Sequence, residues 1–216
     1  MRIIAGTARG RTIEAPPGRD TRPTLDRVRE NLFNMLQSRI PDARVLDPFA
    51  GSGALSFEAL SRGAALAVLG DRDRNALHAE ERNAEKLGFQ KRVRIYPGDW
   101  RRLLARLKAE GARFDLVFLD PPYAMQDLRE ITEELRDLLA EDAWMIVEHA
   151  AKAEVLVAEA YEQINARSWG YCGVSFYALR RETPAEQAAG REPAEQHLDP
   201  SSEFPRAADE TERRGE

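Results

Sequence analysis

The sequence contains little of what indicates a secreted, metal-binding or membrane-spanning protein. Its single cysteine, Cys172, excludes a disulfide framework and any cysteine-based zinc or iron–sulfur site. Its three histidines, His78, His149 and His197, are far apart and lack the spacing of metal ligands. No stretch approaches the roughly 20 apolar residues of a membrane-spanning helix, and the N-terminus is too polar for a secretory signal. We therefore expect a cytoplasmic protein with no metal and no membrane association.

The net charge of −5 over 216 residues conceals an uneven distribution. Residues 1–40 hold eight arginines against four acidic residues, whereas residues 182–216 hold ten acidic residues, four arginines and four prolines. A segment so poor in large apolar residues cannot offset its ordering entropy. We predict three parts: a basic hairpin and helix over residues 1–40 that faces a polyanion, a folded domain over residues 41–181, and an acidic disordered tail over residues 182–216.

The first 40 residues carry two structural signals. Within residues 1–16, two short stretches flank a turn that contains Gly6 and Gly10, which predicts a hairpin. Pro23 marks a helix start, and apolar residues recur at helical spacing from there until shortly before Pro41.

From residue 44 onward, predicted strands and helices alternate. The run Phe114–Leu119 is almost entirely apolar, as expected of a central parallel strand. Two glycines, Gly170 and Gly173, separate the last two strands and indicate an antiparallel pair. The alternation predicts an α/β fold with a Rossmann-like, doubly wound sheet covered by helices on both faces. Strands are expected at 44–46, 65–69, 92–96, 114–119, 143–148, 162–168 and 174–180, and helices at 54–62, 74–87, 100–110 and 128–139.

In such a sheet, ligands bind beyond the carboxyl ends of the strands. The first end reads Asp47-Pro48-Phe49-Ala50-Gly51-Ser52-Gly53. Gly51 and Gly53 permit a tight turn or a close backbone approach to a ligand. A dinucleotide fingerprint requires a third glycine where Ser56 stands. With Asp47 upstream, this departure favours a cofactor that has no pyrophosphate.

Two further acidic residues follow neighbouring strands. Asp71 lies twenty residues after Gly51, and its carboxylate can accept both hydroxyls of a ribose. Asp73 is a rival for that role or a helix cap. Asp99 can accept a hydrogen bond from the exocyclic amine of an adenine, or it can cap the next helix.

The most specific motif is Asp120-Pro121-Pro122-Tyr123, directly after the apolar strand. The two prolines end strand pairing and fix a rigid turn. The Asp120 carboxylate and the Pro121 carbonyl can hold the hydrogens of an exocyclic amine, so that its lone pair faces a methyl donor. Tyr123 offers a ring on which a nucleobase can stack. These groups suit methyl transfer to a base.

The loop Asp47–Gly53 and the motif Asp120–Tyr123 resemble those of class I S-adenosylmethionine-dependent amino-methyltransferases. More specifically, the sequence is similar to the bacterial 16S ribosomal RNA guanine-N2 methyltransferase family over about residues 2–181. The similarity is carried by Arg2–Gly6, Gly10-Arg11, Arg22–Thr24, Asp26–Glu30, Leu32–Asn34 and Gly51–Arg62. In that family, Glu often stands where this chain has Asp71, and the acidic tail lies outside the family pattern.

This resemblance implies a seven-stranded sheet with an antiparallel last hairpin. It also implies methyl transfer from S-adenosylmethionine to N2 of a guanine in 16S rRNA or a partly assembled small subunit. The cofactor would contact Asp47, Phe49, Gly51, Gly53, Asp71 and Asp99, and the guanine would contact Asp120, Pro121 and Tyr123. We expect a monomer.

The basic N-terminal part offers forked donors suited to RNA phosphates. The predicted contacts are Arg9, Arg11, Arg22, Arg27 and Arg29. Pairing of these arginines with acidic residues on the protein's own surface is the simpler interpretation of the same pattern.

Two other functions remain open from the sequence. An adenine-N6 methyltransferase on DNA or RNA would use the same Asp120 motif, although the chain has no room for a separate DNA-recognition domain. A non-catalytic RNA-binding assembly factor would have no need of Asp120 and Tyr123. A nicotinamide dehydrogenase is disfavoured by Ser56 and by the lack of a suitable histidine at a strand end.

Overall fold

A computed structural model describes residues 1–16, 23–122, 125 and 127–181. The chain divides into two units, Met1–Arg180 and Arg181–Glu216, and every element described here belongs to the first. The acidic tail, Arg22 and Tyr123 lie outside the described residues, so the predictions made for them stay predictions. Among the described helices, none has the length and apolar character that crossing a membrane requires.

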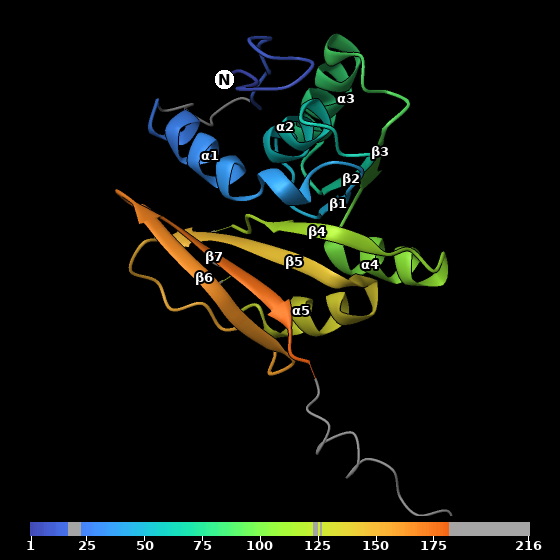
Figure 1. The fold of residues 1–216 in the computed structure, drawn as a ribbon. Coiled ribbons are helices and arrows are strands. Elements are labelled where there is room, and N and C mark those ends of the chain that lie inside the picture. Colours follow the sequence, from blue (N-terminus) through green and yellow to red (C-terminus); the bar gives the residue numbers. More distant parts are fainter. Residues whose placement is uncertain (17–22, 123–124, 126, 182–216) are drawn as a thin grey trace, which may run out of the picture. The chain divides into compact units, whose positions relative to one another are not determined.

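The described residues form one seven-stranded sheet with the order β3-β2-β1-β4-β5-β7-β6 (Figure 1). The first five strands in this order are parallel, and β7 runs antiparallel to β5 and β6. This arrangement confirms the predicted Rossmann-like fold and its antiparallel end hairpin. The strands are β1 Arg44–Asp47, β2 Leu66–Asp71, β3 Val93–Pro97, β4 Phe114–Leu119, β5 Leu139–Ala150, β6 Tyr161–Trp169 and β7 Cys172–Leu179.

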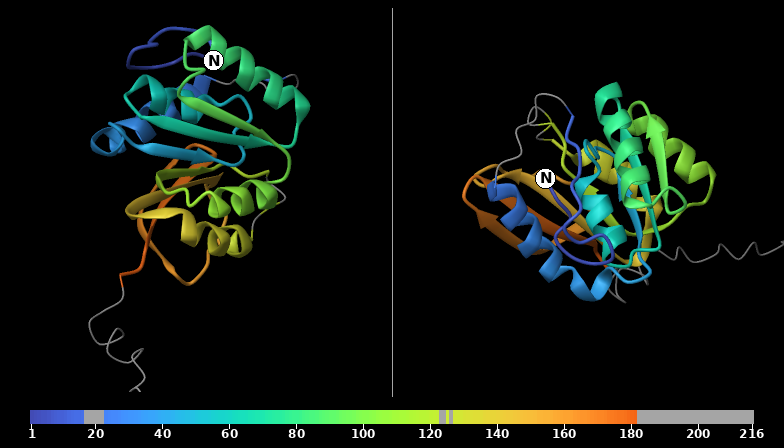
Figure 2. Two further views of the ribbon diagram at one scale, coloured as in Figure 1. Left: turned by 90° about the vertical axis from the view of Figure 1, so that its right-hand side faces the viewer. Right: turned by 90° about the horizontal axis from the view of Figure 1, so that it is seen from above.

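Helices cover both faces of the sheet. Helices α1, α2 and α3 lie on one face and α4 and α5 on the other, as two further views also show (Figure 2). The helices are α1 Pro23–Met35, α2 Ala54–Ser61, α3 Arg74–Leu87, α4 Trp100–Ala109 and α5 Arg129–Leu135, with short 3₁₀ turns at Gln37–Arg39 and Arg136–Leu138.

The position of strand β4 explains why its sequence is apolar except at Asp115. Leu116 and Phe118 pack into the core beneath α1 to α3, whereas Val117 and Leu119 pack into the core beneath α4 and α5. Successive side chains of a strand point to opposite faces, so a strand covered on both sides buries all of them.

The N-terminal segment turns back on itself, as the hairpin prediction requires, but it forms no extended strands. The Ile3 and Ile13 amides donate to the carbonyls of Arg11 and Met1, each at 2.9 Å. The turn packs closely on α2, where a Cβ atom at Gly6 would lie 1.9 Å from the Ser61 carbonyl oxygen. Residues 1–16 therefore belong to the same unit as the sheet.

The largest difference from the predicted boundaries lies between α5 and β5. The predicted helix 128–139 ends at Leu135, a 3₁₀ turn follows, and β5 begins at Leu139 rather than at residue 143. Leu139 pairs with Phe114, and a bulge then separates this pair from the regular register. The exposed acidic pair Glu141 and Asp142 interrupts the apolar pattern and conceals the start of the strand in the sequence.

Candidate active site

The carboxyl ends of the parallel strands bring the predicted acidic residues to one edge of the sheet. Asp47 is the last residue of β1 and pairs in register with Leu69 of β2, two residues before Asp71. Asp99 lies two residues beyond the end of β3, and Asp120 directly follows β4. Together they form a continuous acidic edge, the position at which open α/β sheets bind ligands.

Asp47 lies buried at the base of this edge, with 2% of its surface exposed. The Ser56 hydroxyl donates to its Oδ2 at 3.0 Å, which gives a role to the residue that replaces the third fingerprint glycine. Its Oδ1 has no hydrogen-bond partner among the described residues. Burial raises the pKa of Asp47 to about 7, against the lowering effect of the Ser56 hydrogen bond. The unpartnered oxygen is suited to accept a ligand donor.

The glycine loop between β1 and α2 is held against Asp71. The Gly51 amide donates to Asp71 Oδ2 at 3.0 Å, and the Asp73 amide donates to Asp71 Oδ1 at 2.8 Å. Gly51 and Gly53 have φ values of 59° and 74°. A Cβ atom at Gly53 would also lie 2.4 Å from the Phe57 ring. Both glycines are therefore required by the turn itself.

Two other aspartates act as helix caps. Asp73 accepts from the Asn75 amide at 2.8 Å and begins α3, and Asp99 accepts from the Arg101 amide at 2.9 Å and begins α4. Of the two roles that its sequence position allows, Asp73 therefore takes that of a helix cap. Asp99 remains about half exposed, so its second oxygen is accessible from the acidic edge.

Phe49 and Pro121 complete the predicted site within the described residues. Phe49 lies in the loop after β1, is partly buried and packs against the core beneath α4 and α5. Pro121 is half-buried beside Asp120, and Pro122 is exposed. The Pro122 carbonyl accepts from the Met125 amide at 2.8 Å.

Two polar side chains of β5 and β7 lie near Asp120. The register of β4 and β5 pairs Leu119 with Val147, which places Asp120 beside Glu148. The Cys172 thiol donates to the Glu148 carboxylate at 3.4 Å. Burial raises the pKa of Glu148, and it raises the pKa of the Cys172 thiol, with further contributions from Glu148 and Asp120. The thiol therefore stays protonated and acts as a donor, not as a nucleophile.

The sequence reasoning missed two polar residues of α3 that face the glycine loop. Glu80 and Asn83 are both fully buried. Burial, together with the charges of Asp47 and Asp71, raises the pKa of Glu80 to about 9. The sequence pattern that could have identified them is their helical spacing with the buried residues Ala76, Ala79 and Ala84. This spacing places two polar residues on the apolar face of the helix.

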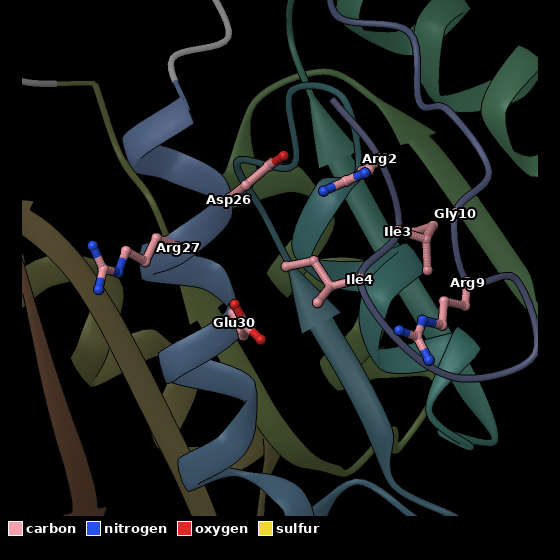
Figure 3. Close-up of a pocket in the computed structure, with 8 residues that line it drawn as sticks. All are labelled: Arg2, Ile3, Ile4, Arg9, Gly10, Asp26, Arg27 and Glu30. Carbon is pink, nitrogen blue, oxygen red and sulfur yellow. The ribbon is translucent and has the colours of Figure 1, made fainter.

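The predicted RNA-binding arginines fall into two groups. Arg9 and Arg27 are exposed and line a cavity of about 420 Å³ between the N-terminal segment and α1 (Figure 3). In Figure 3, Arg2 and Arg9 extend from the N-terminal segment, Glu30 lies on α1, and Arg27 points away from the other lining residues. Neither Arg9 nor Arg27 forms a side-chain hydrogen bond or ion pair within the described part of the chain.

Arg11 and Arg29 are instead engaged by the protein itself. The Arg11 guanidinium donates to the carbonyls of Lys86 and Leu87 at the end of α3. Arg29 is 5% exposed, pairs with Asp26 at 3.0 Å and donates to the Arg2 carbonyl. These two arginines fix the N-terminal segment to the domain, and their predicted use as phosphate ligands stays a prediction.

The strand order, the glycine loop and the rigid turn after β4 define the unit as a Rossmann-like domain of the methyltransferase class. A family model described as conserved hypothetical protein 95 matches residues 1–178, and the chain belongs to this family.

Three proteins illustrate the relationship. "Ribosomal RNA small subunit methyltransferase D" of Escherichia coli (strain K12) is 37% identical over 191 residues, which cover 88% of each chain. "Putative rRNA methyltransferase YlbH" of Bacillus subtilis is 36% identical over 184 residues, 83% of this chain and all of the relative. The solved structure "Putative methyltransferase yhhF" from Escherichia coli has a TM-score of 0.72 and 36% identity, and covers 84% of this chain and 99% of that one.

Proposed function

We propose that the protein transfers a methyl group from S-adenosylmethionine to the exocyclic N2 of a guanine in small-subunit (16S) ribosomal RNA. The observation that carries this proposal is the position of Asp120 and its proline turn on the same sheet edge as the glycine loop and Asp71. The relatives named as ribosomal RNA methyltransferases support an RNA substrate. The choice of guanine N2 rests on the resemblance of the N-terminal motifs.

The residues at the ends of β1, β2 and β3 fit S-adenosylmethionine, a cation with an ammonium group, a ribose and an adenine. The unpartnered Asp47 Oδ1 suits the ammonium group, and the backbone around Phe49, Gly51 and Gly53 would line the methionine part. Asp71 would accept the ribose hydroxyls through the lone pairs that its two backbone contacts leave open. Asp99 would accept from the adenine amine while it caps α4.

Bound S-adenosylmethionine supplies an electrophilic methyl group. The chain contributes the alignment of the nucleophile, because the lone pair of an exocyclic guanine amine is conjugated into the ring and attacks poorly. Asp120 and the Pro121 carbonyl would each accept one N2 hydrogen and favour a pyramidal nitrogen. As the N–C bond forms, the S–C bond to the donated methyl group would break and leave a neutral thioether, and Asp120 would hold the N2 proton until it is released to solvent. Tyr123 would stack on the flipped base, a contribution of about 1–3 kcal/mol.

RNA binding would rest on the exposed arginines of the N-terminal part. Of the five predicted contacts, Arg9 and Arg27 are available to phosphates, and Arg22 stays a prediction. A guanine inside a helix cannot reach the Asp120 turn, so the target must lie in a loop, bulge or other unstacked site. Residues 182–216 contain no element of the proposed site, so we expect deletion of this tail to preserve methyl transfer.

Labelled S-adenosylmethionine tests the proposal directly. Small-subunit RNA and partly assembled subunits, taken from cells that lack this protein, should accept label, and digestion should yield N2-methylguanosine. N6-methyladenosine would establish the adenine alternative, and RNA binding without transfer would establish an assembly factor. Asp120→Asn should abolish transfer and leave cofactor binding intact, whereas Asp137→Asn, an exposed change in the 3₁₀ turn after α5, should behave like the unaltered protein.

A further inference from the structure

The turn between β6 and β7 presents a tyrosine to solvent. Tyr171 is 88% exposed, far more than Leu156 and Ile164, the other large exposed apolar side chains of the described residues. The backbone of the turn is nevertheless well held. Trp169 pairs with Cys172 across it, Gly170 has a φ of 61°, and the Ala151 amide donates to the Tyr171 carbonyl at 2.9 Å. Because the backbone of the turn is already held, the exposed ring can bind a partner with a smaller loss of backbone conformational freedom.

The register of the sheet places this turn at the edge that holds Asp120. Strand β5 pairs Val147 with Leu119 of β4 and Ala150 with Cys172 of β7. The Cα atoms of Asp120 and Cys172 are two strand spacings apart across the sheet and about two residues apart along the strands. This separation corresponds to a distance on the order of 12 Å. The effect of Asp120 on the thiol pKa of Cys172 agrees with this proximity. The turn is thus near the proposed guanine site but is not part of it.

Cationic side chains accompany the exposed ring. Lys152 directly follows the residue whose amide binds the turn, and it is exposed with no hydrogen bond or ion pair among the described residues. The β6–β7 hairpin extends past the end of β4, on the side where α1 begins (Figures 1 and 2). An aromatic ring with basic groups beside it is the combination that binds single-stranded nucleic acid.

We propose that Tyr171 is a stacking platform for an unpaired RNA base adjacent to the target guanine, and that Lys152 binds a neighbouring phosphate. The inference rests on the proposed RNA substrate and adds a contact outside the Asp120 turn. The apolar face of a base can stack on the exposed phenol ring of Tyr171. The negative charge of a neighbouring phosphate can pair with Lys152, which has no ion-pair partner among the described residues. The contact would hold the strand in the unstacked form from which the target guanine enters the site.

Binding and turnover of unmodified small-subunit RNA, transcribed in vitro, test this contact. Tyr171→Ala should weaken RNA binding and raise KM for the RNA by about 5- to 100-fold, as expected for the loss of one stacked base. Affinity for S-adenosylmethionine and the midpoint of thermal unfolding should not change. Tyr171→Phe should retain near-normal RNA affinity, because stacking requires the ring and not the hydroxyl. Ile164→Ala, an exposed change within β6 of the same hairpin, is the matched control.

Each other outcome identifies what has failed. Normal RNA affinity and KM in Tyr171→Ala would overturn the stacking contact while the methyltransferase proposal stands. A loss seen with assembled subunits and not with RNA would assign Tyr171 to a protein partner and overturn it equally. If the unaltered protein neither binds nor methylates RNA, the proposed function falls together with this inference. RNA bearing 5-iodouridine next to the target should crosslink to Tyr171 on irradiation, and absence of that crosslink contradicts the proposal.

Discussion

The side-chain amide of Asn83 on α3 donates to the Ser52 carbonyl of the glycine loop at 3.0 Å. The same amide group donates to the Glu14 carbonyl at 2.9 Å, and its oxygen accepts from the Glu14 backbone amide at 2.8 Å. One buried side chain therefore connects the N-terminal segment, the glycine loop and α3. The shape of the proposed cofactor site depends on this connection, because Ser52 lies between the two glycines that form its turn.

Replacement of Asn83 by alanine should destabilise the domain by about 3 kcal/mol, because three backbone groups lose their partner in a buried place. The free energy of unfolding from urea titration measures this effect. Affinity for S-adenosylmethionine should also fall, since Ser52 is no longer held. Asn75→Ala on the exposed face of the same helix should change neither quantity. Equal stability of the two variants would show that water replaces the Asn83 amide without cost.

Glu80 makes the folded state less stable as the pH rises. Its carboxyl oxygens have no partner among the described residues, and burial raises its pKa from 4.5 to about 9. Between these values the folded state binds the extra proton. The contribution of the protonated Glu80 carboxyl to the free energy of unfolding is therefore complete at low pH. It is lost as pH rises through about 9, at up to about 1.4 kcal/mol per pH unit. Asp47, with a pKa raised to about 7, acts in the same direction.

Glu80→Gln should remove most of this dependence, because glutamine keeps the shape of the protonated acid and cannot ionise. The difference in unfolding free energy between pH 6 and pH 9, from urea titrations at both values, should be clearly smaller in the variant. Glu81→Gln, an exposed change one residue away, should keep the pH dependence of the unaltered protein. A variant as pH-sensitive as the unaltered protein would assign the alkaline loss of stability to other groups.

The sequence predicts the strand ends of the sheet well because each is marked by a local change. The apolar run before Asp120 ends at two prolines, and the glycine pair after Asp47 ends β1 and leads into α2. The start of β5 at Leu139 is not predictable in this way, since its first residues alternate weakly and are held by pairing with Phe114, which is distant in sequence.

The residues of the candidate site likewise divide into those that the sequence predicts and those that it does not. The acidic residues at strand ends are visible because topology alone brings them to one edge. Asn83 and Glu80 are not visible as site residues, because their role depends on how α3 packs against the glycine loop. For the N-terminal arginines, the sequence indicates a function but does not reveal the structural partner. Their composition predicts a phosphate-binding surface, but the partner of Arg11 is the end of α3, some 75 residues away, and no local pattern announces it.

Asp99→Asn separates the two roles assigned to Asp99. An asparagine oxygen caps a helix as well as a carboxylate does, so the bond to the Arg101 amide and the stability of the domain should be retained. An adenine amine that donates to the second carboxylate oxygen would instead meet an amide donor. Affinity for S-adenosylmethionine, measured by calorimetry, should fall about tenfold, the cost of one lost hydrogen bond to a charged group. Unchanged affinity would leave Asp99 with its capping role alone.

Arg9 and Arg29 should respond in opposite ways to alanine substitution. Arg9 is exposed without a side-chain partner among the described residues, so Arg9→Ala should leave stability unchanged, weaken RNA binding and reduce the salt dependence of that binding by about one counterion. Arg29 is buried and holds Asp26 and the Arg2 carbonyl, so Arg29→Ala should lower the free energy of unfolding by about 3 kcal/mol.

Filter binding of RNA across a range of salt concentrations and urea unfolding separate these two effects. Arg29→Lys keeps the charge and loses the forked geometry that contacts both partners, so it should recover only part of the stability. If Arg9→Ala proves to be destabilising and neutral toward RNA, the exposed arginine belongs to the fold. The polyanion-binding surface must then be sought at Arg27 and Lys152.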